Sequence, residues 1–395
     1  MKPTIPRHLL PLAPLAILLA CDTGPRELPS GPNSGITALV STSHRPSAPS
    51  PRGYALTAYD PVRDRVYEVG GFFAPDWTAE IDDIWAFRPR SRTWSLIANT
   101  LPAPLGDAVA LDVKSRKLIM YLPYIDPIET WAYDIETGVW ENRRPATEPP
   151  PRWGSMMVYD PKADRILLYG GTDWNDGSTV LGDLWAYDYE ANTWSELHPP
   201  VSPPPHHFPV LEYVPTIDRV MLFGGYQQGF STLFNDTWAY DYRHNRWTNL
   251  HPANPPAPRA YHYMAYDPTT NRIVLFGGVM DESAWPDSPE LTNDETWIYS
   301  VARNSWHQMF PKHAPSPRAW HVMSHTDGPV MLFGGGPSRL AYNNETYLYD
   351  SHANEWELVS GGEHAVADRA VASGVATMHS TGGRPLSQGA PPLRR

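Results

Sequence analysis

The chain has very little cysteine: Cys21 is the only one among 395 residues. A disulfide needs two cysteines, so the folded part must be held together by packing. The chain also lacks a long apolar run, because residues 9–20 are too few to span a bilayer and include Pro11 and Pro14. The net charge of −12 and the absence of basic runs argue against a nucleic-acid partner.

Familiar catalytic motifs are missing as well. The sequence contains no cysteine pair, no His-Glu-x-x-His segment, no phosphate-binding loop and no Gly-x-Ser-x-Gly turn. The suggestive histidine spacings are His206-His207 and His321 with His325, but residues four apart on a strand are about 13 Å apart, too far for one metal ion. We therefore expect no metal site and no cofactor. A hydrolase with paired carboxylates stays open, although nothing in the sequence pairs them.

What the chain does contain is a repeated unit, most complete at residues 266–306. A Tyr-Asp-Pro turn at 266–268 is followed by the apolar run 273–276, which predicts a strand covered on both faces. Gly277-Gly278 ends this strand, and Trp297 and Trp306 mark two further strands. With the strand that precedes the turn, the unit has four strands.

The pattern recurs six times with fixed spacing. The two aromatic residues of each copy are nine positions apart. These pairs are Trp85/Trp94, Trp131/Trp140, Trp185/Trp194, Trp238/Trp247, Trp297/Trp306 and Tyr347/Trp356. The second copy has Leu122-Pro123 where the glycines should be, and the sixth has a shortened first hairpin at 325–328. Such small sheets cannot bury both faces alone, so the copies must stack on one another.

The apolar run, the Gly-Gly pair, the spaced aromatic pair and an Arg before the first strand together resemble the kelch family. The resemblance covers about residues 51–360 and implies an all-β fold, a six-bladed β-propeller with four antiparallel strands in each blade. The predicted blades are 51–97, 98–143, 144–197, 198–250, 251–309 and 310–360. Residues 369–378 faintly resemble a first blade strand, so a seventh, degenerate blade or a ring-closing strand in the tail 361–395 is the alternative.

The beginning of the chain predicts a leader and a tether. Leu18-Leu19-Ala20-Cys21 resembles a bacterial lipoprotein signal, which implies removal of residues 1–20 and acylation of Cys21. The alternative is an ordinary secretory leader with an incidental cysteine. Residues 21–50 are rich in Pro, Gly and Ser and predict a tether. We expect a monomer anchored by lipid to a membrane of the cell envelope.

The second connection of each unit, after Gly-Gly, varies in length, whereas the first and third are constant. Binding residues favour variable loops on a rigid scaffold, so we expect the functional face at the second and fourth connections. The candidate ligand-binding residues of these loops are Trp77, Asp173, Trp174, Tyr226, Asp281, Glu282 and Trp285. Aromatic rings beside carboxylates suit a glycan, while the alternative is that these side chains pin their own loops.

A second candidate set opens the first strand of the units. Its members are Arg52, Arg152, His206, Arg259 and Arg318. A ring of guanidinium groups would attract a carboxylate-bearing ligand. The alternative is a scaffold role, in which each side chain bonds the neighbouring Pro-rich loop or a Gly-Gly carbonyl.

The sequence therefore favours a tethered binding module for a glycan, a peptide or a partner protein, without catalytic residues. The enzyme alternative is a sialic-acid-type mutarotase or epimerase, which a kelch-like fold and an Arg ring would suit. Some kelch propellers resemble galactose oxidase, a copper enzyme. Its chemistry needs a cysteine beside the metal, and the folded domain of this chain has none.

Overall fold

The computed structural model describes residues 47–73, 81–102, 107–123, 127–227, 232–280 and 292–362. The chain divides into two units, residues 1–45 and 46–395, and all the described residues lie in the second unit. Several sequence predictions therefore fall outside the described residues. These are the leader, Cys21, most of the tether, the tail after 362, Trp77, Asp281, Glu282 and Trp285.

The regular structure of the described residues consists of 26 strands, grouped in six blades. Blade 1 contains β1 (Leu56–Asp60), β2 (Arg65–Val69), β3 (Ile84–Arg88) and β4 (Thr93–Ala98). Blade 2 contains β5 (Ala108–Asp112), β6 (Lys117–Leu122), β7 (Glu129–Asp134) and β8 (Trp140–Asn142). Blade 3 contains β10 (Met156–Asp160), β11 (Arg165–Tyr169), β13 (Leu184–Asp188) and β14 (Thr193–Leu197), and it carries a short pair, β9 (Arg152–Trp153) with β12 (Thr172–Asp173).

The last three blades have the same plan. Blade 4 contains β15 (Val210–Val214), β16 (Arg219–Phe223), β17 (Thr237–Asp241) and β18 (Arg246–Asn249). Blade 5 contains β19 (Tyr263–Asp267), β20 (Arg272–Phe276), β21 (Thr296–Ser300) and β22 (Ser305–Met309). Blade 6 contains β23 (Val322–Ser324), β24 (Val330–Phe333), β25 (Thr346–Asp350) and β26 (Glu355–Ser360).

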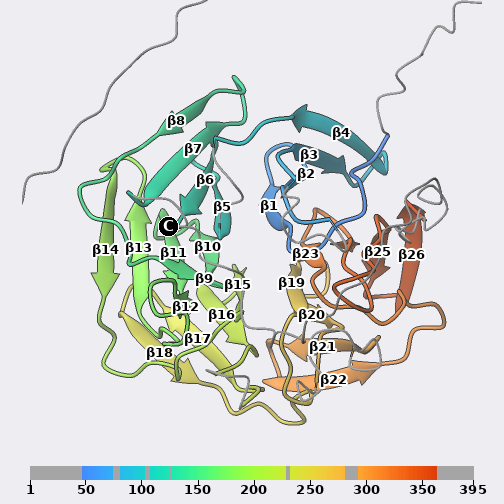
Figure 1. Cartoon of the computed structure of the whole chain (residues 1–395). Coiled ribbons are helices and arrows are strands. Elements are labelled where there is room, and N and C mark those ends of the chain that lie inside the picture. Colours follow the sequence, from blue (N-terminus) through green and yellow to red (C-terminus); the bar gives the residue numbers. More distant parts are fainter. Residues whose placement is uncertain are drawn as a thin grey trace, which may run out of the picture. The chain divides into compact units, whose positions relative to one another are not determined.

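The blades form a closed ring, as Figure 1 shows. Each blade is an antiparallel sheet whose four strands follow one another in the chain. The first strands lie innermost, and each contacts the first strands of both neighbours, including β1 with β23. The predicted six-bladed propeller is thus confirmed, and among the described strands blade 6 meets blade 1 without exchanging one.

The apolar run of β20 shows why the blades must stack. Ile273, Val274, Leu275 and Phe276 are each at most 1% exposed. Alternate residues of a strand point to opposite faces. Accordingly, Ile273 and Leu275 pack against blade 4, while Val274 and Phe276 pack against blade 6. Each second strand thus supplies the core of two interfaces.

One end of the ring carries the tight turns, and we call it the turn face. Asn271 closes the first turn of blade 5 with φ of 54°, in the left-handed region that Asn tolerates. The Tyr266 hydroxyl donates to its side chain at 3.1 Å. In the third turn, Asn304 accepts from Tyr299 at 2.8 Å and donates to the Leu250 carbonyl of the preceding chain at 2.7 Å. These bonds fix the constant connections that the sequence predicts.

A hydrogen bond from the fourth strand joins neighbouring blades. The Trp306 indole N–H of blade 5 donates to the Thr237 hydroxyl of blade 4 at 3.1 Å. The same bond joins Trp94 to Thr346, Trp194 to Thr130 and Trp356 to Thr296. Blades 1 and 3 have Ile84 and Leu184 in place of this threonine. The indole N–H groups that face them, of Trp140 and Trp247 respectively, are buried without a hydrogen-bond partner.

Replacing Thr237 by Val should destabilise the propeller, because the buried Trp306 N–H then loses its acceptor while the volume at position 237 is preserved. We expect a loss of about 1–3 kcal/mol in the free energy of unfolding, measured by urea denaturation. Thr248→Val, an exposed threonine of the same blade, is the control and should change stability by less than about 0.5 kcal/mol. Equal stability of the two variants would contradict the role assigned to this bond.

Candidate functional site on the loop face

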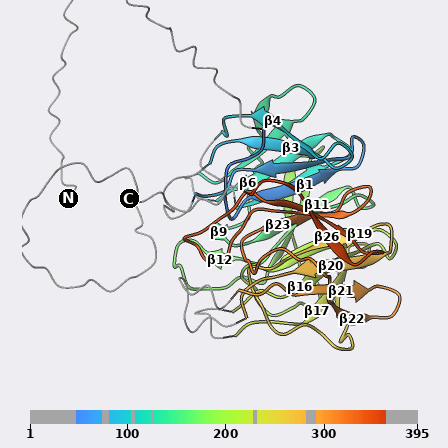
Figure 2. The same cartoon turned by 90° about the vertical axis from the view of Figure 1, so that its right-hand side faces the viewer.

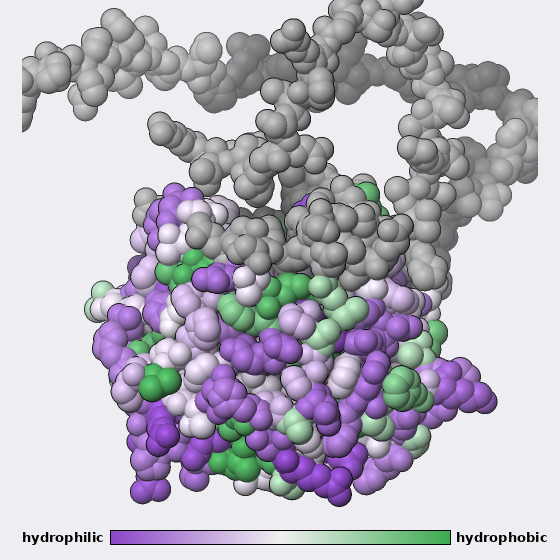
Figure 3. All heavy atoms as spheres, turned by 90° about the horizontal axis from the view of Figure 1, so that it is seen from below, coloured by the Kyte–Doolittle hydropathy of each residue, from purple (hydrophilic) through white to green (hydrophobic). Residues whose placement is uncertain are grey.

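The end of the ring opposite the turns is built from the second and fourth connections, and we call it the loop face. In the side view of Figure 2, the short pair β9–β12 extends on this side. On the side seen in Figure 3 the surface is mostly hydrophilic, with hydrophobic side chains beside the grey atoms at the top and further patches towards the opposite end. The predicted site residues that are described all come from this end.

Arg152 shows what the recurring basic residue does. Its Nε donates to the Pro150 carbonyl at 3.0 Å, and its Nη1 donates to the Gly170 carbonyl at 3.1 Å. Its two Nη atoms also bind the Asp183 carboxylate at 2.6 and 2.7 Å. Burial raises the pKa of Asp183, but the hydrogen bond and charge of Arg152 outweigh this and hold the pKa below its usual value. We call this set of contacts the clamp, because it joins the incoming loop, the Gly-Gly bend and the third strand.

The clamp recurs in four other blades. Its acid partners are Asp83 for Arg52, Asp236 for His206, Glu295 for Arg259 and Glu345 for Arg318. The acid stands two positions before the first aromatic residue, which donates to it from its side chain. These donors are Trp85, Trp185, Trp238, Trp297 and Tyr347.

The clamp also bonds one blade to the next. The carbonyl of Arg318 in blade 6 accepts from the Gly278 N–H of blade 5 at 2.9 Å. The same bond joins Gly171 to His206, Gly225 to Arg259 and Gly335 to Arg52. Gly277 has φ of 64°, and a Cβ at this position would lie 2.5 Å from the Arg318 carbonyl oxygen. The close approach of the two backbones therefore requires glycine.

These contacts account for the five recurring basic residues. Each is at most 1% exposed. All five reach the loop carbonyl two positions earlier, and the four arginines also reach the first-glycine carbonyl of their own blade. The five side chains thus make the contacts expected of a scaffold role, with the neighbouring loop and the Gly-Gly carbonyl. An ionic ring open to a ligand would require these side chains to leave their partners.

The residue two positions after the clamp forms a feature that the sequence interpretation missed. Tyr54, Phe208, Tyr261 and Trp320 have φ between 48° and 59° at these positions. Their rings converge: Phe208 lies 5.8 Å from Tyr54 and 4.9 Å from Tyr261, and Trp320 lies 6.0 Å from Tyr54. Blades 1 and 4 are opposite in a ring of six, so the contact of Tyr54 with Phe208 crosses the axis. We call these four residues the aromatic floor.

The aromatic floor is supported by a buried tyrosine, and its four residues have a strained, left-handed backbone. The Tyr226 hydroxyl, from a predicted site residue, lies 2.9 Å from the Tyr261 hydroxyl, and Tyr226 is 3% exposed. Left-handed backbone at bulky non-glycine residues costs of the order of 1–3 kcal/mol each and clusters at functional sites. Tyr54 and Phe208 are only partly buried, so the floor reaches the surface.

The remaining described candidates, Asp173 and Trp174, belong to a hairpin of blade 3. The Asp173 carboxylate accepts from the Asn175 N–H at 2.7 Å. Asp176 accepts from the N–H groups of residues 178 and 179, each at 2.8 Å, and hydrogen bonds from Thr179 lower its pKa to about 2. Both carboxylates therefore pin their own loop, as the alternative interpretation had it. The backbone N–H of Trp174 donates to the Pro151 carbonyl at 3.0 Å and so ties the hairpin to the Pro-rich loop.

Four histidines near the clamps, His206, His207, His262 and His321, are buried. Burial lowers the pKa of His207 to about 3, so its ring is neutral at pH 7, and Nδ1 lies 3.0 Å from the Thr172 hydroxyl. Burial likewise lowers the pKa of His262 to about 3. Within the described ranges no group of three His, Cys, Asp or Glu residues is arranged to hold a metal ion. The same part of the chain has no helix of the length and hydropathy that crossing a membrane requires.

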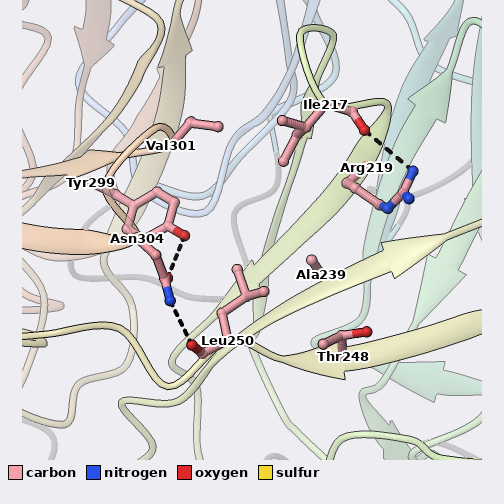
Figure 4. A pocket seen from close by; sticks show the side chains of 8 residues that line it. All are labelled: Ile217, Arg219, Ala239, Thr248, Leu250, Tyr299, Val301 and Asn304. Atoms are coloured by element: carbon pink, nitrogen blue, oxygen red, sulfur yellow. Dashed lines mark hydrogen bonds between the residues drawn. The ribbon is translucent and has the colours of Figure 1, made fainter.

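An open groove of about 340 Å³ lies away from the loop face, between blades 4 and 5 (Figure 4). The Asn304 side chain crosses it to the Leu250 carbonyl, and Arg219 beside it is paired with Asp241 at 2.6 Å. The groove is lined by Ile217, Arg219, Ala239, Thr248, Leu250, Tyr299, Val301 and Asn304. Its polar groups have partners within the fold, and it presents no convergent set of groups to a ligand.

Glu68 is peculiar to blade 1. It is fully buried, 3.3 Å from Arg52, whose guanidinium also binds Asp83 at 2.5 Å. One cation thus faces two carboxylates. Burial raises the pKa of Glu68 to about 8, Arg52 opposes this rise and Asp83 adds to it. The corresponding residues of blades 3–6 are leucines, at 168, 222, 275 and 332.

A ring of four-stranded blades joined by Gly-Gly bends and buried arginine clamps defines a kelch-repeat β-propeller. Residues 120–383, more than half of the chain, match the family described as Attractin/LZTR1 beta-propeller, and the chain belongs to this family.

Curated relatives carry the same repeat. Kelch domain-containing protein 1 of Mus musculus is 26% identical over 258 residues, which are 59% of this chain and 61% of the relative. Kelch domain-containing protein 2 of Bos taurus is 26% identical over 265 residues, 60% of this chain and 62% of the relative. A Kelch domain-containing protein 10 homolog of Drosophila melanogaster is 29% identical over 172 residues, 38% of this chain and 28% of the relative. The chain thus spans less than two thirds of the length of each.

Replacing Glu68 by Gln should change how stability depends on pH. Because the folded-state pKa of Glu68 is raised, folding takes up a proton between about pH 4.5 and pH 8, and stability falls as pH rises through this window. Glutamine removes the ionisation. The free energy of unfolding of the variant, relative to wild type, should therefore be about 2–4 kcal/mol higher at pH 9 than at pH 4.5.

Urea denaturation at both pH values measures this difference. Glu190→Gln, at a carboxylate that is 72% exposed on the turn face, is the control and should not change the slope. Parallel pH profiles for wild type and Glu68→Gln would show that Glu68 ionises normally in the folded state.

Proposed function

We propose that this chain is a non-catalytic interaction module that binds a partner protein on its loop face. The observation that carries the proposal is the contrast between the two ends of the ring. The turn face is constant, whereas the distance from the second glycine to the next aromatic residue ranges from 12 to 19 positions. Variable connections on a rigid scaffold are the usual place for recognition.

Exposed apolar side chains of the loop face support the proposal. Phe73, Met280 and Leu340 are 38%, 39% and 47% exposed, and all three belong to second connections. The residues before Phe73 and Met280 reach the floor. Phe72 packs on Tyr54 with ring centroids 6.2 Å apart, and Val279 belongs to the same buried cluster as Tyr261 and Trp320. Apolar surface gathered around a rigid aromatic centre is typical of protein interfaces.

The finer alternatives receive less support. The glycan prediction relied on Asp173 and its hairpin, but the carboxylates of Asp173 and Asp176 cap their own turn. A mutarotase would need an arginine to hold the sugar carboxylate, but each clamp arginine is saturated by a carboxylate of its own blade. We therefore propose neither activity.

Charged substitutions on the two faces test the proposal. Phe73→Asp with Leu340→Asp should abolish capture of partners from a lysate of the source organism. Val62→Asp with Ile217→Asp, at turn-face residues that are 69% and 38% exposed, is the matched control and should leave capture intact. Circular dichroism and thermal melting check that both variants fold. If the two double variants captured the same partners equally well, the binding site would not be on the loop face. If wild type captured no partner specifically, the proposed function would be refuted.

We further propose that the module is held at a membrane of the cell envelope by a lipid on Cys21. The proposal is supported by the lipoprotein-like sequence at 18–21 and by the position of the sole cysteine there. The full chain should partition into detergent, and its mature N-terminal peptide should carry an acylated Cys21 in mass spectrometry. Cys21→Ser should be released into the aqueous phase. An unmodified cysteine in the mature protein would contradict the anchor.

A further inference from the structure

We propose that the loop face recognises a cationic segment of the partner protein, one that combines Lys or Arg with an apolar or aromatic side chain. This inference rests on the proposed function and adds the chemistry of the partner. Two independent features carry it: the distribution of charge between the two faces, and the aromatic surface at the centre of the loop face.

The charge of the connections differs sharply between the faces. The six connections between second and third strands contain 16 Asp or Glu residues and one basic residue, Arg339. The connections from a fourth strand to the next first strand, which also belong to the loop face, contain 2 Asp or Glu and 6 Lys or Arg. The turn-face connections contain 8 Lys or Arg and 6 Asp or Glu. By sequence, the loop-face connections therefore contain 18 Asp or Glu against 7 Lys or Arg. Such an excess of negative charge attracts a positively charged partner and speeds its encounter.

The clamps consume only part of this charge. Five of the 16 acids are the clamp partners of the five basic residues. Others face solvent: Asp82 and Asp294 are exposed beside two of the clamps, and Asp176 is exposed at the tip of the blade 3 hairpin. A carboxylate without a cation of its own blade contributes to the field that a partner meets.

The aromatic surface gives this field a second recognition element. Tyr54, Phe208 and Trp153 are partly exposed, and the rings of Trp153 and Phe208 are 6.0 Å apart. Lys and Arg side chains bind aromatic faces by cation–π attraction, worth about 0.5–2 kcal/mol. The same rings suit an apolar side chain, as do the exposed Phe73 and Leu340 of the second connections. A segment with both kinds of residue therefore matches the surface better than a purely polar one.

Other cationic or charged ligands fit less well. Acids of the described residues are spread around the ring and nowhere form a group of three that could hold a metal ion. A nucleic acid would be repelled by this face. An acidic peptide would meet an excess of like charge, since the loop-face connections have 18 acids and 7 Lys or Arg, three of which are paired in clamps.

Selection from a random peptide library tests the inference without a known partner. The full chain is used as bait for displayed peptides of about 12 residues, which span roughly 40 Å when extended. We expect enriched peptides to carry Lys or Arg together with Trp, Phe or Leu. Binding of one such synthetic peptide, measured by fluorescence anisotropy, should weaken as salt is raised.

Neutralised variants locate the binding. Asp82→Asn with Asp294→Asn should weaken the peptide about tenfold, whereas Glu190→Gln with Asp327→Asn, at exposed acids of the turn face, should change it less than about twofold. These substitutions lie at exposed side chains, and a thermal melt checks the fold.

Three outcomes are possible. Basic, apolar peptides that depend on the loop-face acids support the inference. Enrichment of acidic or neutral peptides that still lose binding in Phe73→Asp with Leu340→Asp overturns the inference and leaves the proposed function standing. Failure to select any peptide whose binding depends on the loop face overturns both.

Discussion

The structure depends on one repeated polar interaction, the buried arginine clamp. A guanidinium removed from water must have its donors satisfied, and the clamp does this with the incoming loop carbonyl, the glycine carbonyl and a carboxylate. Each partner belongs to a different part of the blade, so the clamp fixes where the loop enters, where the second strand bends and where the third strand begins. The hydrophobic interfaces between blades supply most of the free energy, while the clamp determines their register.

Blade 2 shows what replaces the clamp where its parts are missing. Blade 2 lacks the glycine pair, and its described residues include no clamp arginine. Glu129, at the position of the clamp acid, still accepts a hydrogen bond from the Trp131 indole N–H at 2.6 Å. Instead Asp107 reaches into blade 3, where its carboxylate accepts from the Gly154 N–H at 2.6 Å and the Ser155 N–H at 2.9 Å. A carboxylate that accepts backbone N–H groups is a strong, charge-assisted link. The interface is thus kept although its repeat signature has been lost.

The sequence was sufficient for the architecture because the repeat is local: turn, apolar run, glycines and aromatic pair lie at constant spacing. It also located the five basic residues, and the scaffold alternative named the carbonyls that they contact. Their acid partners were not found, because the separation between base and acid runs from 27 to 36 positions across the variable connection. The constant feature, an acid two positions before each first aromatic residue, was present and would have identified them.

The aromatic floor could not be found by the same means. Its members differ in type and converge from four blades, and what they share is a backbone angle, which residue identity does not reveal for Tyr, Phe or Trp. Tyr226 was predicted as a loop residue that binds ligand, but it lies beneath the floor. Contacts across the axis follow from ring geometry, which exists only once six blades have closed.

Within the part of the chain that the structure describes, the seam between blades 6 and 1 has no strand shared across it. It is held by side chains and single hydrogen bonds, such as Trp94 with Thr346 at 2.9 Å and the two bonds of Arg92 with Glu357 at 2.6 and 2.8 Å. Many ring-shaped folds lock their last sheet by borrowing a strand from the other terminus, whereas this seam is one more interface of the common kind. Because no strand of the described residues bridges this seam, opening it would break side-chain contacts and single hydrogen bonds while the four-stranded sheets of blades 1 and 6 stayed intact.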